Sequence, residues 1–134
     1  MKRNVYIQLP SSLVLQVDDA SPWPEAKRLS ATEGKRLLRA EAAATLRRVL
    51  AEGSEIWGLV LSVSASGMSR KARFYVIAGS RPLNITGDIA RVLDWRHDGG
   101  DWVMLRGCGM DMLWHTVESV SRALGIAGLQ SRRL

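Results

Sequence analysis

The feature that most constrains the fold is a pair of alternating segments joined by a short loop that contains glycine. Apolar residues alternate with other residues from Glu55 to Ala65 and again from Lys71 to Ala78. Alternation at period two is typical of half-buried β-strands, and a loop of this length suits a hairpin. The spacing therefore predicts an antiparallel hairpin, in which Trp57 and Leu59 share one face of the first strand.

Two longer helices are expected around this hairpin. Ser30 and Glu33 have the spacing of a capping box, which predicts a helix from about Ala31 to Glu52. A second helix is predicted from about Met110 to Leu124, where Gly125 follows. Helical periodicity predicts that these residues are buried: Leu38, Ala42, Leu46 and Val49 on the first helix, and Leu113, Trp114, Val117, Val120 and Leu124 on the second.

Shorter elements complete the predicted fold. Asn4–Leu9 and Leu13–Val17 can pair as a hairpin, and Trp102–Arg106 reads as a third core strand. Thr86 is the predicted cap of a short helix over Gly87–Leu93. The order of these elements predicts a single α+β domain, with a mainly antiparallel sheet packed by two longer helices and one short helix.

Length and composition agree with this class of protein. The 134 residues correspond to about one domain, and an apolar fraction of 46% is ordinary for a folded chain. We divide the chain into an irregular or hairpin segment (1–30), an α+β core (31–125) and a C-terminal tail (126–134). No apolar run approaches the roughly 20 residues of a membrane helix, and none follows the basic N-terminus as in a secretory signal. We expect no contact with a membrane and, with a single cysteine, a reducing cytoplasm.

The charge balance is the first indication of function. Four Lys and fifteen Arg stand against thirteen Asp and Glu, which gives a formal net charge of +6. The planar guanidinium makes paired hydrogen bonds to phosphates and carboxylates, so a surface rich in Arg suits partners that carry those groups. On the first helix Arg36, Arg39 and Arg47 lie opposite the apolar stripe and form a basic outer face. This charge permits contact with nucleic acid without showing it.

The five tryptophans are candidates for stacking on nucleic-acid bases. Trp57, Trp102 and Trp114 fall on apolar faces of the predicted elements, so we expect them in the core. Trp23 and Trp95 flank loops and are therefore the predicted surface tryptophans.

The first of two unusual motifs occupies the hairpin loop and consists of Ser66, Gly67, Met68, Ser69 and Arg70. Gly67 lets backbone amides turn inward, and Arg70 and Arg73 add positive charge, so the loop suits a bound anion. The loop lacks the spacing of a P-loop, and no helix follows it. A plain hairpin turn with a basic exit is the alternative interpretation.

The second motif, Gly107 to Met112, separates the third strand from the last helix. Cys108 stands just before the helix, where the macrodipole lowers the pKa of a thiol. A cysteine hydrolase also needs a base, and His115 falls on the polar stripe of the helix, where we expect solvent. The alternative is a small buried cysteine beside Gly109, with Asp111 as a first-turn charge that favours the helix dipole. We therefore predict no catalytic residue and no metal ligand.

The two motifs together, SGMSR and GCGMDM, resemble a family of small, uncharacterised phage and prophage proteins. In that family's pattern a helix and a strand precede an SGMSR-like loop. A strand, a short helix and another strand then lead to a GCGMDM-type start of the last helix. The match covers about Lys35 to Leu124, so residues 1–30 fall outside it. The resemblance implies a phage origin and a shared fold rather than an activity.

The function we expect is that of a small phage-encoded accessory protein that binds a host macromolecule in the host cytoplasm, for example to inhibit a defence complex. The partner would be a host protein or a nucleoprotein complex, with nucleic acid contacted through the basic surface. One alternative is a module that binds a nucleotide or another phosphate ligand, and a second is a cysteine-dependent hydrolase. We expect binding rather than catalysis, and no cofactor.

The residues predicted to bind the ligand or partner are Ser66, Gly67, Met68, Ser69, Arg70, Arg73, Cys108, Gly109 and Asp111. If the first and third core strands run in the same direction, both motifs follow strand ends at the same end of the sheet. We therefore expect the two motifs to lie close together.

Overall fold

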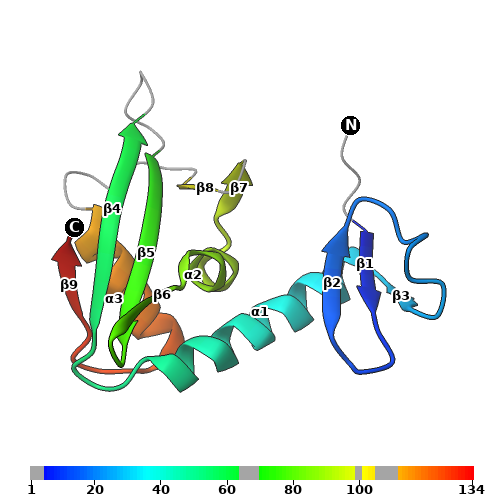
Figure 1. The fold of residues 1–134 in the computed structure, drawn as a ribbon, viewed down its shortest axis with the longest axis horizontal. Helices are drawn as coiled ribbons and strands as arrows, with labels where there is room; N and C mark the ends of the chain where they lie inside the picture. The colour runs from blue at the N-terminus through cyan, green and yellow to red at the C-terminus, as the bar shows by residue number, and fades with distance from the viewer. Residues whose placement is uncertain (1–4, 64–69, 99–100, 105–111) are drawn as a thin grey trace. The chain divides into compact units, whose positions relative to one another are not determined.

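The computed structural model of the chain describes residues 5–63, 70–98, 101–104 and 112–134. These residues form three helices and nine strands in two sheets, which confirms the predicted α+β class (Figure 1). Contacts between residues divide the chain into two compact units, Met1–Glu41 and Ala42–Leu134. Each unit is described by itself below.

The first unit contains a small antiparallel sheet and the beginning of the longest helix. Its strands are β1 (Val5–Gln8), β2 (Val14–Val17) and β3 (Lys27–Leu29), in the order β2-β1-β3. Register pairs run from Val5 with Val17 to Gln8 with Val14, so the predicted N-terminal hairpin is confirmed. The third strand adds to the other edge of β1 and was absent from the prediction.

The longest helix, α1 (Ala31–Val49), begins at the predicted cap. The hydroxyl of Ser30 accepts a hydrogen bond from the backbone N–H of Glu33 at 3.1 Å, as a capping box requires. The helix ends three residues before the predicted Glu52, and the hydroxyl of Ser54 accepts a backbone N–H from the turn that follows. The start of the helix is therefore confirmed, and its end is shorter than predicted.

The buried face of α1 is the predicted one, but it serves two cores rather than one. Leu38 packs with Tyr6 and Val14 in the first unit. Leu46 is completely buried in the core of the second unit, and Val49 packs against that core. The prediction that the whole stripe packs on one sheet was wrong, because a stripe shows which side of a helix is apolar and not what covers it.

The second unit is built on a six-stranded sheet in the order β7-β8-β5-β4-β9, with β6 also paired to β5. Its strands are β4 (Glu55–Val63), β5 (Arg70–Ala78), β6 (Arg81–Asn84), β7 (Arg96–Asp98), β8 (Asp101–Met104) and β9 (Gln130–Arg133). The predicted hairpin is the antiparallel pair β4–β5, and the predicted third strand is β8. The segment predicted as a tail contains β9, which pairs parallel with β4.

Two helices, α2 (Thr86–Leu93) and α3 (Met112–Leu124), lie on one side of β4 and β5 (Figure 1). The core between them and the sheet includes Leu46, Leu50, Ile56, Ala72, Phe74, Val76, Ile85, Ile89, Leu113, Val117, Val120 and Leu124. Gly58 sets how closely α3 approaches, since a Cβ atom at this position would overlap the side chain of Leu113. A glycine inside a strand commonly marks such a close approach.

Thr86 does not cap α2 as predicted. It is the first residue of the helix, and Ile85 in the cap position makes no side-chain hydrogen bond. The Thr86 hydroxyl instead accepts from the Phe74 N–H at 2.8 Å and donates to the Phe74 carbonyl at 3.2 Å. Phe74 lies between the residues of β5 that pair with β8 and those that pair with β6. The Thr86 hydroxyl therefore bonds the backbone of β5 at a position where neither strand does.

The predictions for Trp114 and Trp95 were wrong, and the one for Trp57 is corrected with the candidate site below. Trp114 is 52% exposed on α3, and Thr116 is buried in its place. Trp95, predicted for the surface, packs against the core with its ring centroid 5.7 Å from that of Phe74. Trp23, the other predicted surface tryptophan, is half-buried.

Candidate functional site

Most of the residues predicted to bind lie outside the described residues: Ser66, Gly67, Met68, Ser69, Cys108, Gly109 and Asp111. Of the remaining two, Arg70 begins β5 and is described through its backbone pairing alone. Arg73 is exposed in the same strand, opposite Leu59 in β4.

The strands that precede the two motifs end together. β5 is antiparallel to both β4 and β8, so β4 and β8 run in the same direction. Val63 pairs with Arg70, and Arg70 pairs with Met104, which places the ends of β4 and β8 on one cross-strand row. The condition under which we expected the motifs to meet is therefore confirmed, and the proximity of the motifs themselves stays a prediction.

The described residues reveal a different candidate site, on the face of the β4–β5 pair opposite the core. Ile56 and Gly58 of β4 are buried, so the residues that alternate with them point to the other side. Trp57 is half-buried there rather than in the core, contrary to our prediction. Leu59 and Ile77 on this face are 38% and 46% exposed. We call this surface the open face.

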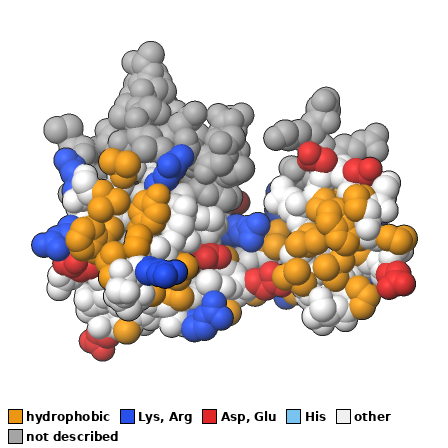
Figure 2. Space-filling view, viewed as in Figure 1, with side chains coloured by type: hydrophobic (Ala, Val, Ile, Leu, Met, Phe, Trp, Pro, Cys, Tyr) orange, Lys and Arg blue, Asp and Glu red, His pale blue; other side chains and the backbone are white. Residues whose placement is uncertain are grey.

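The open face consists of Glu55, Trp57, Leu59, Arg73, Tyr75, Ile77, Asn84 and Arg132. Figure 2 shows hydrophobic side chains gathered over β4 and β5, with Lys and Arg side chains around them. An apolar surface surrounded by cations fits a partner that has both flat apolar groups and negative charge.

A single cross-strand row carries both aromatic residues of the open face. Arg132 in β9 pairs with Trp57 in β4, Trp57 with Tyr75 in β5, and Tyr75 with Asn84 in β6. Residues directly opposite each other in a sheet have neighbouring side chains, so this row is continuous across four strands. The guanidinium carbon of Arg132 lies 4.9 Å from the centre of the Trp57 ring, within cation–π range.

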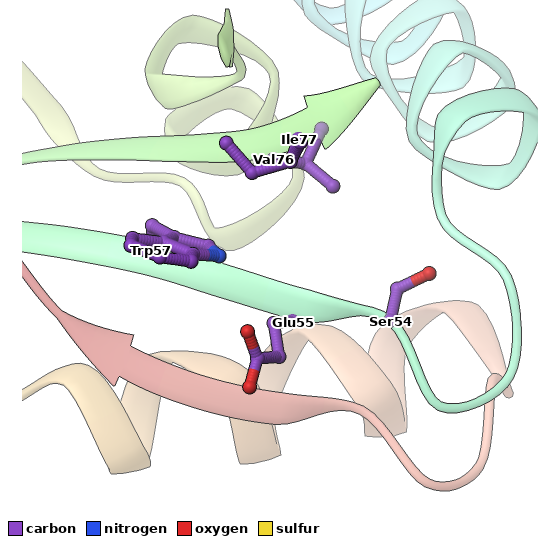
Figure 3. Close-up of a pocket in the computed structure, with 5 residues that line it drawn as sticks. All are labelled: Ser54, Glu55, Trp57, Val76 and Ile77. Carbon is purple, nitrogen blue, oxygen red and sulfur yellow. The ribbon is translucent and has the colours of Figure 1, made fainter. Parts of the chain in front are cut away.

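A shallow pocket of about 350 Å³ lies where β4 begins and β5 ends (Figure 3). It is lined by Ser54, Glu55, Trp57, Val76 and Ile77. The pocket thus adds a carboxylate and a hydroxyl beside the aromatic ring of the open face. These groups can stack on a planar ligand and form hydrogen bonds to its edge.

The cysteine-hydrolase alternative stays a prediction, because Cys108 lies outside the described residues. His115 is exposed on α3, as predicted, with its ring edge-on to Trp114 at 5.1 Å. Within the residues that the structure describes, no three His, Cys, Asp or Glu side chains gather as a metal site. No helix among those same residues is both long and apolar enough to cross a bilayer.

The sequence contained one signal for the open face that our prediction did not use. Both faces of β4 carry apolar residues, so alternation alone does not say which face is covered. Gly58 alternates with Trp57, and its missing side chain is what admits Leu113 of α3. The face that carries the glycine is the one that packs, which leaves Trp57 on the other side.

Comparison with known proteins adds no relative from which a role could be transferred. The chain matches no family model, and no curated protein or solved structure is significantly similar to it.

Proposed function

We propose that this chain is a binding protein for single-stranded nucleic acid and that the open face is its binding surface. The observation that carries the proposal is the row Arg132–Trp57–Tyr75–Asn84 on the side of the sheet opposite α2 and α3. Aromatic side chains on an open antiparallel sheet stack on unpaired bases, and neighbouring arginines contact phosphates.

The charge of the chain favours a polyanion. The formal net charge is +6, and Arg73 and Arg132 lie in different strands of the open face. Cations in more than one strand of the same face suit an extended backbone with a phosphate at every nucleotide.

The shape of the surface favours a single strand over a duplex. In a duplex the base faces are stacked on one another, and proteins reach the base edges through a groove with a helix or a β-ribbon. Trp57 and Tyr75 instead lie next to each other on the surface of a sheet, where an aromatic ring can stack on a base that is not already stacked in a helix.

This proposal is the nucleic-acid form of the binding role expected from the sequence. Single-strand binding would give a phage accessory protein its contact with a host nucleoprotein complex, including a defence complex. That biological setting remains a prediction. The phosphate-ligand and cysteine-hydrolase alternatives also remain predictions, because they depend on Ser66–Ser69 and Cys108.

The proposal is tested by fluorescence anisotropy with labelled strands of about 12 nucleotides, a length within the range that single-strand sites occupy. We expect the chain to bind mixed-sequence single-stranded RNA or DNA more tightly than the matching duplex. Affinity should fall as salt rises from about 50 to 200 mM, because phosphate contacts release counterions.

The matched variants are Trp57→Leu on the open face and Trp114→Leu on α3, since both remove one tryptophan outside the buried core. Trp57→Leu should weaken binding by about 1–3 kcal/mol, the usual range for one stacked base, and Trp114→Leu should not. Equal losses in both variants, or no binding by the wild type at low salt, would refute the proposal. If the chain binds no single strand and a protein partner instead protects the backbone amides of Leu59 and Ile77 from hydrogen exchange, protein binding would replace this proposal.

A further inference from the structure

We infer that the open face prefers strands that contain guanine, with Glu55 binding the Watson–Crick edge of a base that is stacked beside Trp57. This inference rests on the proposed function and names the base that the site selects. It comes from the pocket at the start of β4, which places one carboxylate next to the aromatic row.

The position of Glu55 follows from the strand. Glu55 precedes Trp57 by two residues in β4, so both side chains lie on the open face. Both residues line the same pocket, together with Ser54 and Ile77 (Figure 3). The Glu55 side chain is 38% exposed, so a ligand in the pocket can reach it.

Arg132 lies close to the Glu55 carboxylate without closing it off. Its Nη1 lies 3.9 Å from the Glu55 Oε2, while its guanidinium lies over the ring of Trp57. A separation of 3.9 Å is within ion-pair range but too long for a hydrogen bond. The carboxylate therefore lies beside the arginine and the aromatic ring, and a bound base can supply hydrogen bonds to it.

The chemistry of a carboxylate selects among the bases. An ionised carboxylate has two acceptor oxygens and no donor. Guanine offers two adjacent donors on its Watson–Crick edge, N1–H and the N2 amino group, which match the two oxygens. Adenine and cytosine place an acceptor nitrogen next to their amino group, and uracil places a carbonyl on each side of its N3–H. Only guanine meets both oxygens with donors.

The experiment measures the affinity of the full chain for single-stranded RNA repeats of about 12 nucleotides, in which every fourth base of a uracil strand is replaced by guanine, hypoxanthine (as inosine), adenine or cytosine, or is left as uracil. We expect the guanine repeat to bind at least about five-fold more tightly than the adenine, cytosine and uracil repeats, the lower end of the discrimination that a bidentate contact provides. Inosine lacks the N2 amino group, so its repeat should lose most of that advantage.

The decisive variant is Glu55→Gln, which keeps the size of the side chain and replaces one acceptor oxygen with a donor. We expect it to lose the preference for guanine, so that it binds the guanine and uracil repeats with affinities within about two-fold of each other, since base contacts and not phosphate contacts carry the preference. Glu118→Gln is the control, because Glu118 forms the corresponding pair with Arg122 on α3 at 3.0 Å. It should keep the preference for guanine.

The possible outcomes distinguish this inference from the proposed function on which it rests. Equal affinity of the wild type for all five repeats refutes the inference and leaves the proposed function standing. A preference for guanine that persists in Glu55→Gln removes Glu55 as its source. No binding to any repeat refutes the proposed function itself. If Glu55→Gln fails to fold, the comparison of guanine with inosine in the wild type still decides the inference.

Discussion

The two faces of the sheet in residues 42–134 are built by the same strands and differ in what lies against them. On one face Ile56 and Phe74 are almost completely buried beneath the helices. On the other, Leu59 and Ile77 remain exposed, and Leu59 pairs with Arg73. Both faces are apolar, so hydrophobicity does not distinguish them. The difference lies in shape, since the covered face carries Gly58 and the open face carries Trp57 and Tyr75.

The largest expected difference between a covered site and the open face comes from adding a charge to each. Leu46→Asp places a carboxylate at a completely buried position in the core, which should cost several kcal/mol and unfold the second unit. Leu59→Asp adds the same charge to the open face and should change the free energy of unfolding by about 0.5 kcal/mol or less. Urea denaturation of both variants measures the difference. A cooperative, native-like transition in Leu46→Asp would show that the core has been misplaced.

A smaller effect is expected where α3 meets the sheet. Gly58→Ala introduces a Cβ atom that overlaps the side chain of Leu113, so either the side chain or the helix must move. Overpacking of this kind costs about 1–3 kcal/mol. Adding Leu113→Ala removes the overlapping atoms, so Gly58→Ala should cost less in that background than in the wild type. Simple additivity of the two losses in thermal denaturation would argue against direct packing at Gly58.

The smallest effect on folding, and one directed at the open face, is expected from Arg132→Gln. The side chain is 58% exposed, and its loss should change the free energy of unfolding by no more than about 1 kcal/mol. Binding to a single strand should weaken. The magnitude of the slope of log affinity against log salt concentration should fall by about one, as expected for the loss of one phosphate contact. Arg122→Gln on α3 removes the same charge and should leave that slope unchanged.

Local patterns in the sequence predicted much of the scaffold. The cap at Ser30, the β4–β5 hairpin and the end of α3 at Gly125 depend on residues that are close in the chain. Hydrogen bonds and periodicity over such short distances leave few alternatives. The buried stripe of α3 was also predicted except at Trp114, which is large and apolar but lies at the edge of the 3.6-residue period.

Elements that depend on distant partners were missed. The strand β9 consists of exposed polar residues, and its parallel pairing with β4 rests on backbone hydrogen bonds that any side chain permits. The role of Thr86 likewise depends on Phe74, twelve residues earlier and in another element. Neither partner can be read from the local sequence.

The candidate site shows the same division. The sequence by itself determined that Trp57 and Leu59 share a face, that Tyr75 and Ile77 share another, and that the chain is rich in arginine. Only the tertiary structure decided that these faces are one surface, that α3 covers the opposite side, and that β9 brings Arg132 over Trp57. The physical reason is that alternation is a property of each strand, whereas burial depends on where the helices pack and on which strands become neighbours.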